Sequence, residues 1–156
     1  KIKKTLVLGA GGVAPSIILA LIKSNIKDIT VTNRTYEKAL FLKRKFQLIS
    51  TLKWTKYKEH LNKYDYIINA TSLGLNEEKN FDYLFENLKK KAIFIDTIYN
   101  PKQTKMIKHL KEKNIKTFNG LNMFIYQGQK SFYLWHKINP EIDDDLIELL
   151  NSAIYD

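Results

Sequence analysis

An α/β fold built on a mainly parallel sheet is predicted by two features of this 156-residue sequence. The first is an alternation of short apolar runs with segments of helical periodicity, the pattern of strands joined by crossover helices. The second is a glycine-rich turn, residues 9–14, between the first apolar run and the first helix. In that frame, the turn is typical of a Rossmann-like domain, which is doubly wound with helices on both faces of a six-stranded sheet.

The elements follow one another along the chain without a linker. The first strand is expected at Thr5–Leu8 and a buried helix around Ile17–Ile22. A second strand is expected at Ile29–Thr32, and apolar spacing predicts a helix over Tyr36–Phe46. The remaining expected elements are a weak strand near Lys53–Trp54, a short helix at Tyr57–Lys63, strands at Tyr66–Asn69 and Ala92–Asp96, a helix at Met106–Lys113, a strand at Lys116–Phe118, and helices at about Met123–His136 and Pro140–Ile154.

The last helix is expected to begin at Pro140, because proline suits the first turn of a helix. The acidic residues Glu141, Asp143, Asp144 and Asp145 complement the positive end of its dipole. Without a repeat or a low-complexity tract, residues 1–156 are expected to form a single domain. Because the first strand starts almost at the first residue, we expect this domain to be part of a longer protein.

Composition limits the possible functions. The sequence has no cysteine, which excludes disulfides and thiolate metal sites, and no apolar run approaches the ~20 residues that cross a bilayer. We expect a cytoplasmic protein with no membrane partner and no metal. The net charge of +10 would suit nucleic acid, but only Arg34 and Arg44 of the 26 basic residues are arginine, the usual reader of base edges. We therefore expect no nucleic-acid partner.

The glycine turn predicts a binding site for the pyrophosphate of a dinucleotide. The first glycine permits a tight turn, the second lets phosphates approach, and the small Ala14 allows the helix to pack closely on the strand. Backbone N–H groups at the helix N-terminus then face the anion. A glycine turn without a ligand is the alternative interpretation. The candidate pyrophosphate-binding residues are Gly9, Ala10, Gly11, Gly12 and Val13.

The end of the second strand indicates which dinucleotide is bound. NAD-binding domains usually place an acidic side chain there, which accepts a hydrogen bond from the ribose. Here neutral Asn33 is followed by Arg34 and, one helical turn later, by Lys38. A guanidinium can bind a 2′-phosphate with a planar fork of donors, whereas a carboxylate would repel it. The expected cofactor is therefore NADP; in the alternative, Arg34 and Lys38 are ordinary solvated cations.

The expected strand order, 3-2-1-4-5-6, places a ligand site between the first and fourth strands at their carboxyl ends. Three loops should converge there, Gly9–Ala14, Asn69–Gly74 and Asp96–Pro101. Thr71 and Ser72 offer hydroxyl groups beside the cofactor, or they only cap local backbone.

The third of these loops presents Tyr99, because Pro101 keeps Asn100 out of the helical region. Packing of Tyr99 against the sheet edge is the alternative. For Asp96 at a strand end, a turn or capping role is favoured over a general base. The three histidines are His60, His109 and His136. None has an acidic or metal-ligating residue at a spacing typical of a catalytic or metal site, so we expect all three on the surface.

Together, these motifs resemble the C-terminal, NADP-binding domain of the shikimate dehydrogenase family. Their ordered combination is specific, although any one of them could occur by chance. One departure is Asn122, where the family usually has glycine, so the local backbone is expected to differ. The motifs are Gly9-Ala-Gly-Gly-Val-Ala14, Asn33-Arg-Thr35, Asn69-Ala-Thr-Ser72, Asp96-Thr-Ile-Tyr-Asn-Pro101, Asn119-Gly-Leu-Asn-Met123 and Tyr126-Gln-Gly128.

The resemblance implies a role for each matched position. Tyr99 and Gln127 would contact the substrate. In the alternative interpretation, Gln127 is an ordinary amide on the surface of a helix. The catalytic lysine and aspartate would lie in an N-terminal domain, so no catalytic residue is expected in this sequence. The cofactor-binding positions are residues 9–13 at the pyrophosphate, Asn33, Arg34, Thr35 and Lys38 at the adenosine phosphate, and Thr97 and Gly120 at the nicotinamide half, together with Thr71 and Ser72.

The implied activity is the reversible, NADPH-dependent reduction of 3-dehydroshikimate to shikimate, a step towards chorismate and the aromatic amino acids. The small-molecule substrate would be shared with the N-terminal domain, and this part would bind cofactor without turnover. A monomer or a homodimer is expected. Two alternatives are a related dehydrogenase that acts on quinate with NAD, and a non-catalytic dinucleotide-binding module.

Overall fold

The computed structural model describes residues 3–76, 78–82 and 84–155 and contains one six-stranded sheet. Its strand order is β3-β2-β1-β4-β5-β6, and every neighbouring pair is parallel. The predicted strand order and the Rossmann-like fold class are therefore confirmed. The strands are β1 (Lys4–Leu8), β2 (Asp28–Asn33), β3 (Ile49–Lys53), β4 (Tyr66–Asn69), β5 (Ile93–Asp96) and β6 (Lys116–Phe118).

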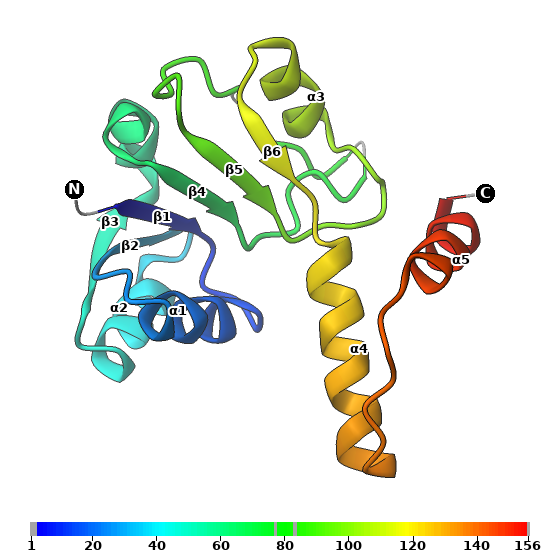
Figure 1. Cartoon of the computed structure of the whole chain (residues 1–156). Coiled ribbons are helices and arrows are strands. Elements are labelled where there is room, and N and C mark those ends of the chain that lie inside the picture. The colour runs from blue at the N-terminus through cyan, green and yellow to red at the C-terminus, as the bar shows by residue number, and fades with distance from the viewer. Residues whose placement is uncertain (1–2, 77, 83, 156) are drawn as a thin grey trace.

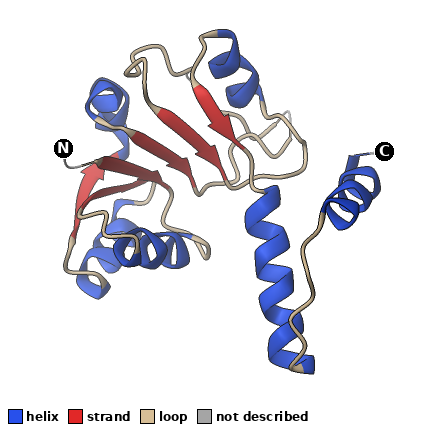
Figure 2. Ribbon diagram, in the orientation of Figure 1, coloured by secondary structure: helices blue, strands red, loops and turns tan. Residues whose placement is uncertain are grey.

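Helices cover both faces of this sheet (Figures 1 and 2). Two α-helices, α1 and α2, lie on one face, while the 3₁₀ helix η1 and the α-helix α3 lie on the other. The helices are α1 (Ala14–Lys23), α2 (Tyr36–Lys45), η1 (Trp54–Lys63), α3 (Lys105–Glu112), α4 (Leu121–His136) and α5 (Asp144–Tyr155).

Each face of the sheet has its own apolar core. Side chains alternate along a strand, so neighbouring residues of β1 point to opposite layers. Leu6 and Leu8 belong to the core beneath η1 and α3, and Val7 belongs to the core beneath α1 and α2. All three side chains are fully buried. Both faces of a parallel sheet are normally buried in this way.

The third strand lies earlier than the sequence predicted. It spans Ile49–Lys53, and Trp54 already begins η1, so the prediction of a strand near Lys53–Trp54 was wrong in its position. The buried Ile49 pairs in register with Ile29 of β2. Ile49 is the buried residue of this strand and most of its neighbours are polar, so the strand contains no apolar run by which the sequence could predict it.

The start of the last helix also differs from the prediction. α5 begins at Asp144, and the chain at Pro140 is not helical. The carbonyl oxygen of Pro140 accepts a hydrogen bond from Nε2 of Gln129 on α4 at 2.8 Å. The Oδ1 atom of Asp143 accepts one from the backbone N–H of Leu146 at 2.8 Å. Asp143 thus acts as the capping residue, and an aspartate is better suited to that position than a proline.

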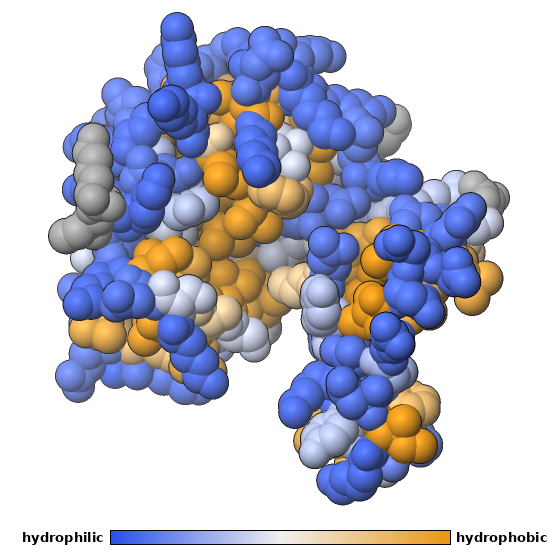
Figure 3. Space-filling view, in the orientation of Figure 1, coloured by the Kyte–Doolittle hydropathy of each residue, from blue (hydrophilic) through white to orange (hydrophobic). Residues whose placement is uncertain are grey.

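Beyond the sheet, α4 extends away from the carboxyl ends of the strands (Figure 1). Only Leu121 and Ile125 of α4 are buried, and within the described residues of α5 none is. The Trp135 side chain is 77% exposed. Apolar side chains also gather in the hollow between α1 and α4 (Figure 3). Among the residues that the structure describes, no helix has both the length and the apolar character needed to cross a membrane.

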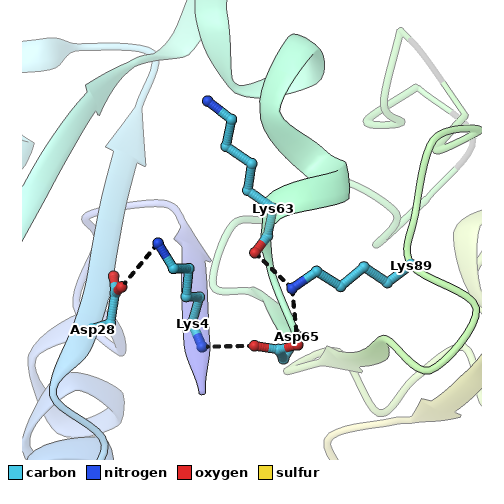
Figure 4. A network of polar contacts seen from close by, with 5 residues as sticks. All are labelled: Lys4, Asp28, Lys63, Asp65 and Lys89. Atoms are coloured by element: carbon cyan, nitrogen blue, oxygen red, sulfur yellow. Dashed lines mark hydrogen bonds and ion pairs between the residues drawn. The ribbon is translucent and has the colours of Figure 1, made fainter. Parts of the chain in front are cut away.

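A polar network joins the strands at the opposite, amino end of the sheet (Figure 4). The backbone N–H of Lys4 donates to Asp65 at 2.9 Å, and Nζ of Lys89 contacts the same carboxylate at 2.9 Å and the carbonyl oxygen of Lys63 at 2.8 Å. Nζ of Lys4 pairs with Asp28 at 3.4 Å. The backbone hydrogen bond from Lys4 and then the Lys89 ammonium hold the pKa of Asp65 below its ordinary value. This network therefore joins the strands at the edge of the sheet opposite the carboxyl ends, where the ligand site is expected.

Candidate functional site

Three loops meet at the carboxyl edge of the sheet, namely residues 9–13, 70–75 and 97–102, which follow β1, β4 and β5. Backbone hydrogen bonds tie them to neighbouring strands. For example, the N–H of Gly9 donates to the carbonyl oxygen of Thr32 at 2.8 Å. The structure thus brings together the loops that the sequence placed at the switch point.

A cleft of about 640 Å³ opens between these loops. It contains two of the candidate residues from the loop after β5, Thr97 and Tyr99. The residues that line it are Val13, Ala70, Thr71, Ser72, Leu75, Thr97, Ile98, Tyr99 and Asn100.

A second cleft of about 200 Å³ lies beside the first and shares Thr71 and Ser72 with it. It contains every residue that the sequence assigned to the adenosine phosphate. Its lining consists of Asn33, Arg34, Thr35, Lys38, Trp54, Thr71, Ser72 and Leu73. The two clefts therefore form one continuous edge, with cations at one end and Tyr99 at the other.

The glycines of the first loop serve different purposes. Gly9 has φ of +109°, a region that side chains rarely adopt, and a Cβ atom on it would lie 2.6 Å from the carbonyl oxygen of Ala70. Gly11 and Gly12 are exposed, and a Cβ atom on either would meet nothing within 4 Å. Gly9 is thus needed for chain packing, while Gly11 and Gly12 leave space open before the N-terminus of α1. Ala14 is fully buried in the core beneath that helix, as its predicted packing role requires.

Asn33 fastens the glycine loop to the end of β2. Its Oδ1 accepts a hydrogen bond from the N–H of Ala10 at 3.0 Å, and its Nδ2 donates to the carbonyl oxygen of Thr35 at 2.8 Å. An amide can do both, whereas a carboxylate could accept from Ala10 but could not donate to Thr35. The neutral residue at this position therefore has a role within the chain itself, which sequence reasoning missed.

Arg34 and Lys38 are exposed at the smaller cleft. Within residues 3–76, 78–82 and 84–155, neither cation has a carboxylate within ion-pair distance. Thr35, the N-cap residue of α2, makes no capping hydrogen bond with its side chain. Two uncompensated cations beside a hydroxyl group suit a phosphate.

A buried polar network lies beneath the wall that the clefts share. Nδ2 of Asn69 donates to Oδ1 of Asp96 and to the carbonyl oxygen of Leu73, both at 2.9 Å. The hydroxyl of Thr71 donates to Oδ1 of Asn69 at 2.6 Å and accepts from the N–H of Leu73 at 3.0 Å. The Thr71 hydroxyl thus caps local backbone, while Thr71 also lines both clefts. Ser72 is exposed in both clefts.

Asp96 is fully buried and accepts three hydrogen bonds. Its Oδ1 accepts from Nδ2 of Asn69 at 2.9 Å and from the N–H of Ile98 at 3.1 Å, and its Oδ2 accepts from the hydroxyl of Thr104 at 2.9 Å. The bond from Ile98 is the turn role favoured by the sequence. Burial outweighs these bonds and raises the pKa of the carboxyl to about 6.

Asp96→Asn is expected to make stability less dependent on pH. The pKa of Asp96 rises from 3.8 to about 6 on folding, so its protonated form favours the folded state, and that contribution is lost as pH rises through 6. A pKa difference of about two units between the folded and unfolded states corresponds to ~3 kcal/mol in the free energy of unfolding, which is the largest effect we expect. Asparagine keeps the acceptor for Ile98 and can donate to Thr104. Urea unfolding should show the variant more stable than the parent by about 1–3 kcal/mol at pH 7.5, and similar to it at pH 4. Parallel pH profiles for the two proteins would contradict this assignment.

Tyr99 is held from behind by the last two helices. Its ring stacks on that of Phe124 of α4, with centroids 4.6 Å apart and planes 21° apart. Its carbonyl oxygen accepts a hydrogen bond from the hydroxyl of Tyr155 at the end of α5. Nζ of Lys102, from the same loop as Tyr99, lies 5.0 Å from the Tyr155 ring centroid. Sequence reasoning did not find this support, because no local pattern connects positions so far apart.

Gly120 and Gln127 do not line either of the described clefts. Gln127 is exposed on α4. Gly120 is buried, its N–H donates to the carbonyl oxygen of Ile98 at 3.0 Å, and a Cβ atom on it would lie 2.0 Å from the carbonyl oxygen of Thr97. Gly120 therefore allows the start of α4 to pack on the loop after β5. Asn122 lies in the first turn of α4 and is helical like its neighbours, so the departure from the family's glycine leaves the helix intact.

The surface prediction was wrong for His109. This side chain is only 15% exposed, and its Nε2 lies 3.3 Å from a carboxylate oxygen of Glu86, which also pairs with Lys113. Spacing could not reveal this partner, because it lies in the long segment between β4 and β5. His136 is exposed and His60 half-buried. No group of three or more His, Cys, Asp or Glu side chains that could hold a metal occurs in the described part of the chain.

Comparison with known proteins identifies the family. A sequence model of shikimate/quinate 5-dehydrogenase matches residues 1–123. The chain belongs to the shikimate/quinate 5-dehydrogenase family. It is 47% identical to the shikimate dehydrogenase (NADP(+)) of Pelagibacter ubique, across 97% of this chain and 56% of that protein.

Solved structures of the family share this fold. Shikimate dehydrogenase from Aquifex aeolicus superposes with a TM-score of 0.78 at 36% identity, covering 90% of this chain and 52% of that one. Shikimate 5-dehydrogenase from Thermus thermophilus, solved with NADP(H) and shikimate, gives a TM-score of 0.77 at 29% identity, with the same coverage of 90% and 52%. The chain thus spans about half the length of the relatives that it matches.

Proposed function

We propose that this chain is the cofactor-binding part of an NADP-dependent shikimate dehydrogenase, which reversibly reduces 3-dehydroshikimate to shikimate on the route to chorismate and the aromatic amino acids. The observation that carries the proposal is the cleft in which Arg34 and Lys38 lie without carboxylate partners among the described residues, next to the glycine loop. The names of its relatives and the ligands of the Thermus thermophilus structure support the same cofactor and substrate.

In this proposal the pyrophosphate lies over Gly11 and Gly12, where the open space faces the N-terminus of α1. The first turn of that helix contains no acidic residue, so nothing there offsets the positive end of its dipole. The 2′-phosphate is bound by Arg34 with Thr35 and Lys38. Asn33 takes part as well, because only one N–H of its amide donates within the chain, to the carbonyl oxygen of Thr35, and the second N–H can donate to the cofactor.

The larger cleft takes the nicotinamide and the substrate. When bound, the cofactor supplies the hydride, and this chain supplies orientation. Val13 and Thr97 border the nicotinamide in this arrangement. The hydroxyl of Tyr99 faces the substrate, with its ring fixed by the stack on Phe124. Gln127 completes the substrate contacts from α4, and Gly120 keeps α4 close to the loop that carries Tyr99.

The substrate site is completed by a further domain, which supplies a lysine and an aspartate as the catalytic pair. Two observations support this part of the proposal. Relatives are nearly twice as long as the matched region, and α4 exposes a row of large apolar side chains that a second domain would cover. The proposal also includes a location in the cytoplasm and a monomeric or homodimeric state. The absence of cysteine is compatible with that compartment. The alternative of a quinate enzyme using NAD is disfavoured by Arg34 beside a neutral Asn33.

Arg34→Ala tests the cofactor. Calorimetric titration of this chain should show NADPH binding more tightly than NADH. The variant should lose about 10- to 100-fold in NADPH affinity, as expected for hydrogen bonds to a charged group, and less than about threefold in NADH affinity. Arg44→Ala is the matched control, because Arg44 is exposed at the other end of α2 and lies outside the cleft. Tighter binding of NADH by the parent, or equal losses for both cofactors, would overturn the proposal.

A further inference from the structure

We propose that Trp54 forms the wall of the smaller cleft against which the adenine ring of the cofactor packs. The inference rests on the proposed function, since it takes NADP(H) as the ligand. Trp54 is the first residue of η1, directly after β3, and lines the same cleft as Arg34 and Lys38. No sequence motif pointed to it.

The indole is held in place by the core. Its ring lies 4.6 Å from that of Tyr57, with the planes tilted by 50°, and Tyr57 is fully buried. The Trp54 side chain also packs against the apolar core that contains Leu6 and Leu8. Trp54 itself is only half-buried, because part of it borders the cleft. A flat aromatic surface that is already fixed binds a ligand with little further loss of conformational freedom.

The chemistry of the cleft favours the base as the group that meets this ring. If Arg34 binds the 2′-phosphate, the adenine is attached to the neighbouring carbon of the same ribose and must lie within a few ångströms of that phosphate. A volume of about 200 Å³ is below the ~300 Å³ at which pockets begin to enclose whole drug-sized ligands, so it suits one part of the dinucleotide. Trp54 is the aromatic residue among those that line it. Stacking of a base on an aromatic ring commonly strengthens binding by about tenfold.

The first test compares two nucleotides that differ only in their base. Adenosine 2′-phosphate and cytidine 2′-phosphate carry the same ribose phosphate, so Arg34 contacts both alike. The parent chain should bind the adenosine compound more tightly. Trp54→Leu should weaken binding of adenosine 2′-phosphate by about tenfold and of the cytidine compound by less, and Trp54→Phe should retain part of the difference. Arg34→Ala should weaken both compounds equally.

The second test uses the two tryptophans of the sequence as reporters. Trp135 is 77% exposed on α4 and lies outside the cleft, so Trp135→Phe leaves Trp54 as the single source of tryptophan fluorescence. Its emission should change during titration with adenosine 2′-phosphate, with the dissociation constant that calorimetry gives. The emission of Trp54→Phe, which retains Trp135, should stay constant. Because the first of these proteins keeps Trp54, the inference can be tested even if Trp54→Leu does not fold.

The outcomes separate the inference from the function on which it rests. If the parent binds NADPH but Trp54→Leu binds adenosine 2′-phosphate as tightly as the parent, the inference is wrong and the proposed function stands. Equal affinity of the parent for the two nucleotides, or a constant Trp54 emission, would also overturn it. If the parent binds neither NADPH nor adenosine 2′-phosphate, the proposed function fails and the inference falls with it.

Discussion

Gly120→Ala is expected to destabilise the chain by more than about 3 kcal/mol, which exceeds the ~1–3 kcal/mol that is typical of overpacking. The added Cβ would lie 2.0 Å from the carbonyl oxygen of Thr97 and 2.5 Å from its carbonyl carbon. Both are backbone atoms, so no side-chain rotation can relieve the contact. The N–H of Gly120 also donates to the carbonyl oxygen of Ile98 at 3.0 Å, and separating the segments would break that bond. Thermal unfolding should shift down by about 10 °C.

Gly128→Ala is the matched control for this prediction, since Gly128 lies on the same helix. It is exposed, and a Cβ atom on it would meet nothing within 4 Å. Alanine is a better helix former than glycine by up to about 1 kcal/mol, so this variant should melt at or slightly above the parent temperature. If Gly120→Ala melted at nearly the same temperature as the parent, the close packing of α4 on the loop after β5 would be wrong.

Gly9→Ala and Gly11→Ala are expected to separate folding from cofactor binding. At Gly9, φ is +109° and the new Cβ would lie 2.6 Å from the carbonyl oxygen of Ala70, so we expect a loss of about 3 kcal/mol or more in stability. At Gly11, the methyl group would meet no atom of the chain within 4 Å. It would instead enter the space proposed for the pyrophosphate. Gly11→Ala should therefore melt like the parent but lose at least about tenfold in NADPH affinity, the effect of one lost contact to a charged group.

Thermal unfolding with and without NADPH measures both effects in one experiment, because a ligand that binds only the folded state raises the melting temperature. The Gly9 variant should melt well below the parent in the absence of NADPH. The Gly11 variant should match the parent without NADPH and show a smaller rise with it. An undiminished rise for the Gly11 variant would mean that the pyrophosphate does not lie over this loop.

Features set by neighbours in the chain could be predicted from the sequence. The strand at Tyr66–Asn69 has the predicted bounds, because its apolar residues stand next to one another and are framed by polar ones. The strand order followed from the glycine turn between the first strand and the first helix, since that arrangement belongs to one topology. The weak third strand and the start of α5 were misplaced, because one depends on register with β2 and the other on a capping side chain.

For the candidate site, the sequence by itself determined which residue types stand at the carboxyl edge, including Arg34 beside Asn33. The tertiary structure decided what each of them touches. It placed Trp54 in the same cleft as Arg34, brought the hydroxyl of Tyr155 within hydrogen-bond distance of the carbonyl oxygen of Tyr99, and left Gln127 outside both clefts. The physical reason is that periodicity and turn chemistry act over a few residues, whereas these contacts depend on how separate loops pack at one edge of the sheet.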